Sequence, residues 1–206
     1  MTVKTPPLLP PIDRPDIVIP DSGPSIHLAM VGELGLLHEI GGAVVIVDMV
    51  RHEIVQDLAK PGAADLQKWI EDGLVPGSNR PVEISVTETG AAFRLARLVE
   101  PEFRMRNAGE QAIVNWLGEK LDGTGRRAIV VYENGKVPTA IRRQGIDADI
   151  DVLTTRAFLA LAEHRKIIAS ADAIWQRIVA AAPTTNPSID AFSHRRSGSG
   201  DISPLR

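Results

Sequence analysis

The chain has 206 residues, with 23 Lys and Arg against 26 Asp and Glu, so its formal net charge is -3. This length predicts one domain with a substantial core. The absence of cysteine excludes thiolate catalysis, Cys-based zinc sites and disulfides, and it fits a cytoplasmic protein. Nucleic-acid binding would need a local basic patch, because the whole molecule is not a polycation. The aromatic content of 4% argues against a single-strand binder built on many stacking rings.

Neither end of the chain has the composition of a folded segment. Residues 1–16 contain five prolines and predict a flexible, Pro-rich arm. Residues 183–206 are rich in Pro, Ser, Thr, Asn and Gly and predict a disordered tail, so the domain is expected over 17–182. The first residues lack the apolar core of a secretory signal, and no apolar run is long enough to span a bilayer. We therefore expect no membrane partner.

Strand and helix patterns alternate along the predicted domain. Continuous apolar runs predict buried strands at 17–19, 43–47 and 128–132. Residues 150–153 predict a further strand, and an alternating run predicts a short strand at 82–87. Helical patterns follow at 26–40 (interrupted near Gly32 and Gly35), 48–58, 64–70, 91–98, 109–117, 138–143, 158–163 and 171–181. This alternation predicts an α/β fold, with a central, mainly parallel sheet between two helical layers.

Four acidic residues stand at comparable places in this pattern. Asp21 follows the first strand, Glu53 lies in the helix after the second, Glu110 begins a helix, and Glu133 follows the strand at 128–132. In a parallel sheet these positions converge at the carboxyl edge, where ligands usually bind. An oxygen-rich site without cysteine suits Mg²⁺ or Mn²⁺. Such ions activate water and stabilise an in-line phosphoryl displacement.

Each of these acids also has a simpler structural explanation. Asp21 has the residue type of a helix N-cap, and Glu53 has the position of a solvated helix residue. Glu110 fits a first-turn acid favoured by the helix dipole, and Glu133 fits an ordinary turn beside Asn134. The recurrence of acids at one predicted edge favours a shared site over four separate explanations.

The same stretches carry a family resemblance. Residues 21–29, Asp-Ser-Gly-Pro-Ser-Ile-His-Leu-Ala, followed by Gly-Glu-Leu at 32–34, resemble the opening motif of PIN-domain proteins. Residues 45–54, which include Glu53, resemble the second motif, and Ala-Gly-Glu-Gln-Ala-Ile at 108–113 resembles the third. Residues 130–134 stand where the family has a strand followed by acidic residues, and residues 152–159 resemble its last strand and helix. The resemblance covers roughly residues 17–180 in the family's order.

The resemblance implies a three-layer α/β/α, PIN-like domain that cleaves RNA with a divalent metal, as the toxins of many toxin–antitoxin pairs do. By that likeness Asp21, Glu110 and Glu133 would bind Mg²⁺ or Mn²⁺, and Glu53 would join them in catalysis. Ser22, Asn134 and Thr155 would support these ligands or contact the phosphate. The family commonly has Asp where this chain has Glu133 or Asn134, and the sequence leaves the choice between them open.

The likeness also implies partners. These are RNA, an antitoxin protein and a second copy of the chain. The alternative is a degenerate PIN-like domain that binds RNA or a protein without cleaving it. His27, on the apolar first helix, is predicted to be packed rather than catalytic. Arginines of the second half of the chain are either ordinary solvated residues or the local phosphate patch: Arg94, Arg97, Arg104, Arg106, Arg126, Arg127, Arg142 and Arg143.

Overall fold

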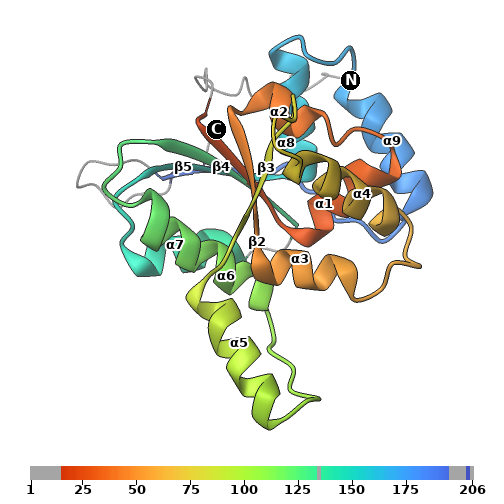
Figure 1. Cartoon of the computed structure of the whole chain (residues 1–206). Coiled ribbons are helices and arrows are strands. Elements are labelled where there is room, and N and C mark those ends of the chain that lie inside the picture. The colour runs from red at the N-terminus through yellow and green to blue at the C-terminus, as the bar shows by residue number, and fades with distance from the viewer. Residues whose placement is uncertain (1–14, 134–135, 195–202, 205–206) are drawn as a thin grey trace.

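A computed structural model describes residues 15–133, 136–194 and 203–204, in which one sheet has helices on both faces (Figure 1). The strand order is β3-β2-β1-β4-β5-β6-β7. The first five of these are mutually parallel, whereas β6 runs antiparallel to β5 and β7 antiparallel to β6. The prediction of an α/β fold with a mainly parallel central sheet is confirmed. The strands are β1 (Ile17–Pro20), β2 (Ala43–Val47), β3 (Val82–Ser85), β4 (Arg127–Tyr132), β5 (Asp149–Thr154), β6 (Ala191–His194) and β7 (Ser203–Pro204).

The helices form two layers. The helices α1, α4, α8 and α9 pack together over one face, and α6 and α7 pack over the other (Figure 1). Within the described ranges, no helix is both long and apolar enough to cross a membrane. The helices are α1 (Ser22–Met30), α2 (Leu36–Ile40), α3 (Asp48–Val55), α4 (Ala63–Leu74), α5 (Glu88–Val99), α6 (Ala108–Trp116), the π-helix η1 (Leu117–Leu121), α7 (Lys136–Gln144), α8 (Thr155–His164) and α9 (Ala171–Ala181).

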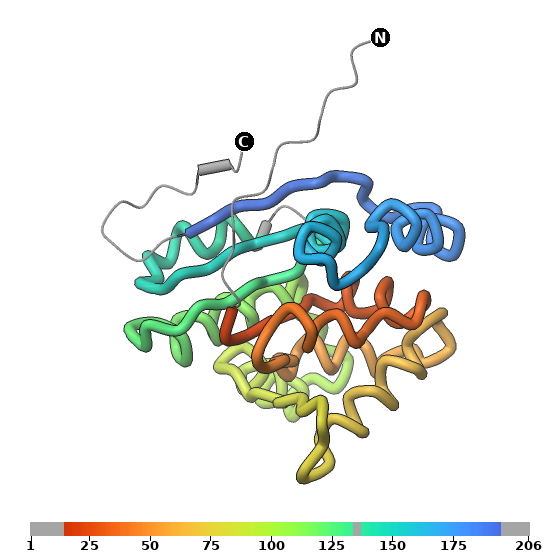
Figure 2. Tube along the Cα trace, turned by 90° about the horizontal axis from the view of Figure 1, so that it is seen from above, coloured from red at the N-terminus to blue at the C-terminus, as the bar shows by residue number. Residues whose placement is uncertain are grey.

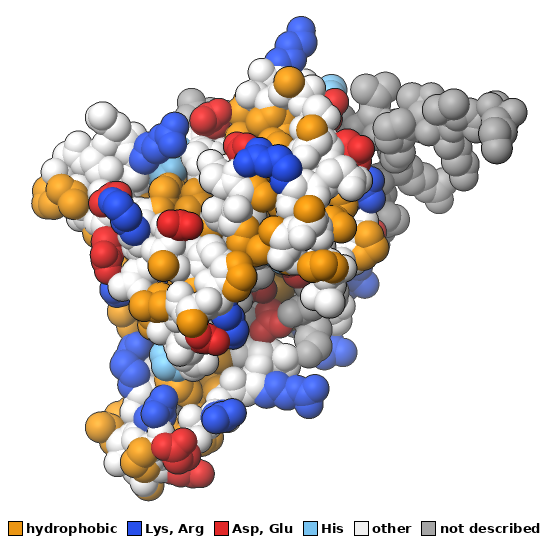
Figure 3. Space-filling view, turned by 90° about the vertical axis from the view of Figure 1, so that its right-hand side faces the viewer, with side chains coloured by type: hydrophobic (Ala, Val, Ile, Leu, Met, Phe, Trp, Pro, Cys, Tyr) orange, Lys and Arg blue, Asp and Glu red, His pale blue; other side chains and the backbone are white. Residues whose placement is uncertain are grey.

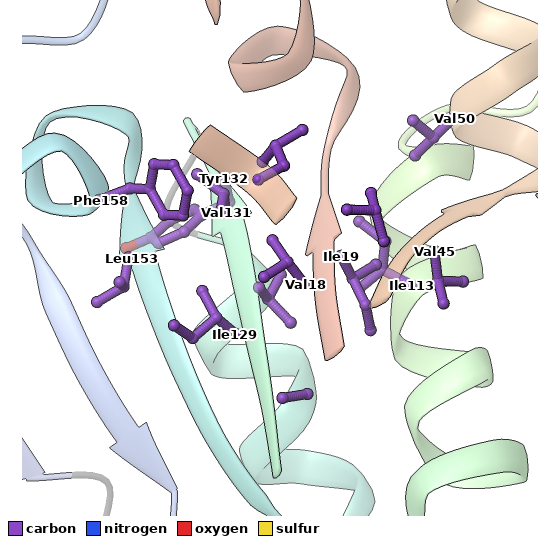
Figure 4. Packing of buried hydrophobic residues seen from close by; sticks show 14 of the residues in the cluster. Val18, Ile19, Val45, Val50, Ile113, Ile129, Val131, Tyr132, Leu153 and Phe158 are labelled. Atoms are coloured by element: carbon purple, nitrogen blue, oxygen red, sulfur yellow. The ribbon is translucent and has the colours of Figure 1, made fainter. Parts of the chain in front are cut away.

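The continuous apolar strands are buried on both sides, as their composition predicts. Side chains of β1 and β4, such as Val18 and Ile129, lie side by side in the core (Figure 4). Phe158 of α8 closes over Val131 from one helical layer, and Ile113 of α6 packs from the other (Figure 4). Burial of apolar surface at about 25 cal/mol per Å² makes this the main stabilising contribution to the fold. The central strands are therefore rigid supports for whatever their carboxyl ends present.

The prediction of a disordered tail over 183–206 is wrong for its described residues. β6 pairs with β5, and Thr154 fixes the approach, because its amide donates to Asp190 O at 2.9 Å and its hydroxyl to Ser188 O at 2.8 Å. Ala191 and His194 are only 9% and 7% exposed. Figure 2 shows this segment running beside β5 at the border of the sheet. The domain therefore extends at least to His194, and residues 195–202 and 205–206 lie outside the described ranges.

The predicted arm also ends earlier than residue 16. Pro15 O accepts the Gly42 amide at 3.1 Å, and the Asp16 amide donates to Arg127 O at 3.0 Å. These bonds place residues 15 and 16 in the domain, while residues 1–14 of the predicted arm lie outside the described ranges.

Another difference concerns residues 82–91. The strand ends at Ser85 and the helix begins at Glu88, because Thr87 is an N-cap whose hydroxyl accepts the Gly90 amide.

Candidate functional site

The topology selects one place on the carboxyl edge of the sheet. β1 is paired with β2 on one side and with β4 on the other, so the chain reverses its winding direction there. In open α/β sheets, the crevice outside the strand ends at such a switch point is the usual ligand site. Asp21 directly follows β1, and Glu133 directly follows β4. Two of the predicted acids therefore flank the switch point.

Asp21 is held rigidly by its own backbone. Its amide donates to Val131 O at 2.8 Å, which extends the β1–β4 ladder by one bond. Its carbonyl accepts the Ser25 amide and hydroxyl, and its carboxylate accepts the Ser22 amide at 2.8 Å. Asp21 is thus the N-cap of α1, as the simpler interpretation predicts. The capping hydrogen bond involves only Oδ1 of the carboxylate, so it does not occupy Oδ2.

The electrostatics of Asp21 show that the four acids lie together. Burial raises the pKa of Asp21 to about 7, and the Ser22 amide opposes that rise. Like charges at Glu53, Glu110 and Glu133 raise the same pKa further. These three glutamates belong to α3, to α6 and to the end of β4. Elements distant in sequence therefore bring their carboxylates together at Asp21. We call this cluster of four acids the acidic crevice.

Glu53 joins three helices at this crevice. Its Oε2 accepts the Ser22 hydroxyl of α1 at 2.7 Å, and its Oε1 accepts the Gly109 amide of α6 at 3.1 Å. A Cβ on Gly109 would lie only 3.0 Å from Glu53 Oε1. A glycine at the start of α6 thus allows the carboxylate of α3 to reach the helix backbone. The third resembling motif contains this glycine immediately before Glu110.

Glu133 is held from three sides. The Thr155 hydroxyl donates to its Oε1, and Nδ1 of His27 lies 3.3 Å from the same atom. The side-chain Nδ2 of Asn186, in the C-terminal segment, donates to the Glu133 backbone carbonyl at 2.8 Å. A Cβ on Gly23 would lie 3.1 Å from Glu133 Cγ. Among the described residues, nothing donates to the buried Oε2 of Glu133, so this atom retains its capacity as a ligand.

Ser22 and Thr155, two of the three residues predicted to support the acids, contact them, and His27 joins them. The hydroxyls of Ser22 and Thr155 both donate to carboxylates of the crevice. Asn134 lies outside the described residues, so the structure places only Glu133 of that pair. His27 is partly buried, but it contacts Glu133 rather than packing in the core alone. A sequence signal existed, since Gly23 and His27 are one helical turn apart and share the face on which Glu133 lies.

The side chains gathered at Asp21 offer oxygen donors, chiefly carboxylates and hydroxyls. Oxygen ligands without sulfur or paired histidines suit Mg²⁺ or Mn²⁺. A cation would offset the burial and the repulsion that raise the pKa of Asp21, and it would give the unpartnered Oε2 of Glu133 a partner. Within the described part of the chain, no three acidic or histidine side chains are arranged to hold one ion together. Glu53 and Glu133 instead direct their oxygens at donors of the protein, chiefly Ser22 and Thr155.

The predicted arginine patch divides between the two edges of the sheet. Four arginines lie where β4 begins and α7 ends, at the edge away from the acids: Arg126, Arg127, Arg142 and Arg143. The other four lie on α5 and the segment after it, at the carboxyl edge: Arg94, Arg97, Arg104 and Arg106. Only the second group can meet a phosphate that binds at the acidic crevice.

α5 projects from the carboxyl edge and is anchored at its base (Figure 1). Asp48, which follows β2, accepts the Thr87 hydroxyl at 2.8 Å and the Thr87 amide at 3.3 Å. Arg94 donates to the same carboxylate at 2.8 Å. A Cβ on Gly90 would lie 1.9 Å from Asp48 Oδ2, so α5 approaches too closely for any side chain there. Asp48 therefore secures the projection rather than joining the acidic crevice.

The fold and the site together define an α/β domain with helices on both faces of its sheet and a carboxylate-lined crevice at the switch point. Compared with protein-family models, curated proteins and solved structures, the chain matches none of them. The resemblance to PIN-domain proteins therefore stays a prediction from the sequence motifs.

Proposed function

We propose that the protein is a PIN-like, divalent-metal-dependent endoribonuclease. The observation that supports this most strongly is the gathering of acids around Asp21. Glu53 accepts the hydroxyl of the adjacent Ser22, Glu133 lies against Gly23, and Glu110 acts on the Asp21 carboxylate. Like charges gathered in a partly buried crevice destabilise a fold unless a cation balances them. Four different elements supply these charges, and all four side chains carry the same sign. The arrangement therefore favours a cation-binding function over a structural one.

Asp21, Glu110 and Glu133 are the residues that would hold Mg²⁺ or Mn²⁺. When bound, such an ion supplies activation of a water molecule and neutralises charge on the phosphodiester. Asp21 brings a carboxylate fixed by backbone bonds at both sides. Ser22 and Thr155 orient Glu53 and Glu133 through their hydroxyls. Rigid placement of this kind is what a displacement at phosphorus requires of its protein groups.

A degenerate domain is the second candidate, and one observation favours it. The carboxylates of Glu53 and Glu133 are bound to donors of the protein rather than aimed at a common point. A domain that only binds RNA or a protein partner would tolerate this arrangement. An antitoxin partner, a toxin role and a homodimer belong to the nuclease proposal. A small reading frame beside the gene would support the antitoxin.

Cleavage of end-labelled single-stranded RNA by purified protein, with Mg²⁺, with Mn²⁺ and with EDTA, tests the nuclease proposal. Asp21→Asn and Glu110→Gln are each expected to lower the cleavage rate at least about 100-fold, since a metal ligand stabilises the transition state by several kcal/mol. Asp72→Asn is the matched control, because Asp72 is exposed and pairs with Lys68 on α4. Wild-type rates in both site variants would rule the mechanism out. Calorimetry that detects no Mn²⁺ binding to the wild type would establish the degenerate domain.

A further inference from the structure

A cavity of about 510 Å³ adjoins the acidic crevice. It lies between α3, α5 and residues 100–107, which lead from α5 into α6, and Glu53 forms part of its wall. Glu53 therefore belongs to both places, so a molecule bound in the cavity is a direct neighbour of one bound at the acids. The volume is within the range of pockets that hold small organic groups, roughly 300 to 1,000 Å³.

Aromatic rings form one wall of this cavity. Phe93 is only 6% exposed and supports two outer rings, with His52 at 4.8 Å and Phe103 at 6.1 Å between ring centroids. His52 and Phe103 are partly exposed and line the cavity. Burial and the charge of Arg97 lower the pKa of His52, while Glu53 opposes this, so the imidazole is mainly neutral at pH 7. Both outer rings can therefore stack on a flat ligand.

Charged and amide groups complete the lining. Arg97 and Arg104 border the cavity, and the Arg97 guanidinium lies 5.8 Å from the centre of the Phe93 ring. Gln56 and Glu102 add an amide and a carboxylate. Figure 3 shows Lys and Arg side chains around apolar surface on the projection at the bottom of the molecule. An apolar protein side chain in this cavity would desolvate these charges without pairing them, which is unfavourable. A flat ligand with polar edges and a flanking negative charge pairs with the two arginines and with the Gln56 amide.

We propose that this cavity binds one unpaired base of a single-stranded RNA, next to the phosphodiester held at the acidic crevice. The base stacks on Phe103 and His52, and Arg97 and Arg104 contact the flanking phosphates. The cavity selects single strands, because a base inside a duplex cannot enter it. One base needs only one or two rings, so the low aromatic content of the chain agrees with the site. The proposal rests on the proposed function for its choice of RNA.

Fluorescence anisotropy with a labelled single-stranded RNA of about 12 nucleotides tests the cavity in EDTA and low salt, where cleavage does not interfere. Phe103→Leu keeps an apolar side chain but removes the ring. Loss of one stacked base is worth about 1 to 3 kcal/mol, so the dissociation constant is expected to rise roughly 5- to 150-fold. Phe103→Trp restores binding to near the wild-type value, which separates stacking from damage to the fold.

The arginines are tested through salt dependence. Arg97→Gln and Arg104→Gln are each expected to reduce the slope of log affinity against log salt by about 0.7, the value for one phosphate contact on a single strand. Arg143→Gln is the matched control, because Arg143 is exposed and lies at the opposite edge of the sheet. It removes the same charge and is expected to leave the slope unchanged.

Unchanged RNA binding by Phe103→Leu overturns the proposal, and so does an equal loss with a duplex of the same sequence. Wild-type protein that binds no RNA also overturns it. The nuclease proposal fails separately: a Phe103-dependent affinity without metal-dependent cleavage leaves the cavity assigned and removes the nuclease. Metal-dependent cleavage with no effect of Phe103→Leu on RNA binding leaves the nuclease proposal standing and removes the base-binding cavity.

Discussion

Replacement of Asp21 by asparagine is expected to stabilise the protein, and the gain is expected to grow from acidic to neutral pH. Asparagine has nearly the same shape and also serves as an N-cap, so the contact with the Ser22 amide survives. What disappears is a buried negative charge that Glu53, Glu110 and Glu133 repel. Few substitutions at a proposed catalytic residue strengthen a fold, so a gain here would show that the folded protein buries an unfavourable charge at Asp21.

The expected magnitude follows from the shifted pKa of Asp21, which rises from 3.8 to about 7 on folding. A raised pKa means that the folded state binds the proton more tightly than the unfolded state does. Stability therefore falls as the pH rises from about 4 to 7 and levels off above 7. At 1.36 kcal/mol per pKa unit the loss at pH 8 is about 4 kcal/mol. Asp21→Asn is expected to recover that amount at pH 8, about 1 to 2 kcal/mol at pH 5 and almost nothing near pH 3.

Urea denaturation followed by circular dichroism in EDTA measures these differences. Mn²⁺ at pH 8 is expected to raise the unfolding free energy of the wild type and to leave Asp21→Asn much less affected, because a ligand that binds only the folded state stabilises it. Asp72→Asn, at an exposed acid of α4, provides the control with no pH-dependent gain. A variant that is no more stable than the wild type at pH 8, or one whose gain does not change with pH, would refute the reasoning.

Three further changes probe the supports of the site. Gly109→Ala brings a methyl group to 3.0 Å from a Glu53 oxygen, so RNA cleavage is expected to fall about tenfold or more while the urea midpoint stays near the wild-type value; unchanged cleavage would show that the close approach is unimportant. Gly90→Ala displaces Asp48 and is expected to lower the unfolding free energy by roughly 1 to 3 kcal/mol, an effect absent if α5 is only loosely anchored. A chain that ends at residue 182 lacks β6 and is expected to melt at a clearly lower temperature; a normal melting curve would mean that residues 183–206 add nothing to the domain.

The sequence carried enough information to predict the sheet but not its last strands. Buried parallel strands are continuous apolar runs, and such runs at 17–19, 43–47 and 128–132 became β1, β2 and β4. A strand near the border of a sheet needs less apolar surface, since ladder bonds to a formed neighbour stabilise much of it. β6 therefore lies in a polar, Pro-containing segment whose composition resembles that of a tail. Its formation depends on β5, which local sequence does not reveal.

The site was predictable to a similar extent. The positions of Asp21 and Glu133 follow from strand ends and parallel topology alone. The contact of His27 with Glu133 depends on how α1 is rotated over the sheet, a tertiary result. The cavity beside Glu53 depends on the angle of α5, which Asp48 fixes through contacts between residues 39 and 46 positions apart in sequence. Periodicity within one segment contains no information of that kind.

The projection formed by α5 separates the surface that would select a ligand from the acids that would act on it. It leaves the sheet after β3 and returns at α6, and its outer surface, with Leu95, Leu98 and Val99, faces solvent. Substitutions or insertions there need not disturb Asp21 or the strands that carry it. During divergence, such a segment is free to change which molecules are accepted while the acidic crevice keeps one chemistry. For the engineer, it is the first place to exchange residues when a different preference is wanted.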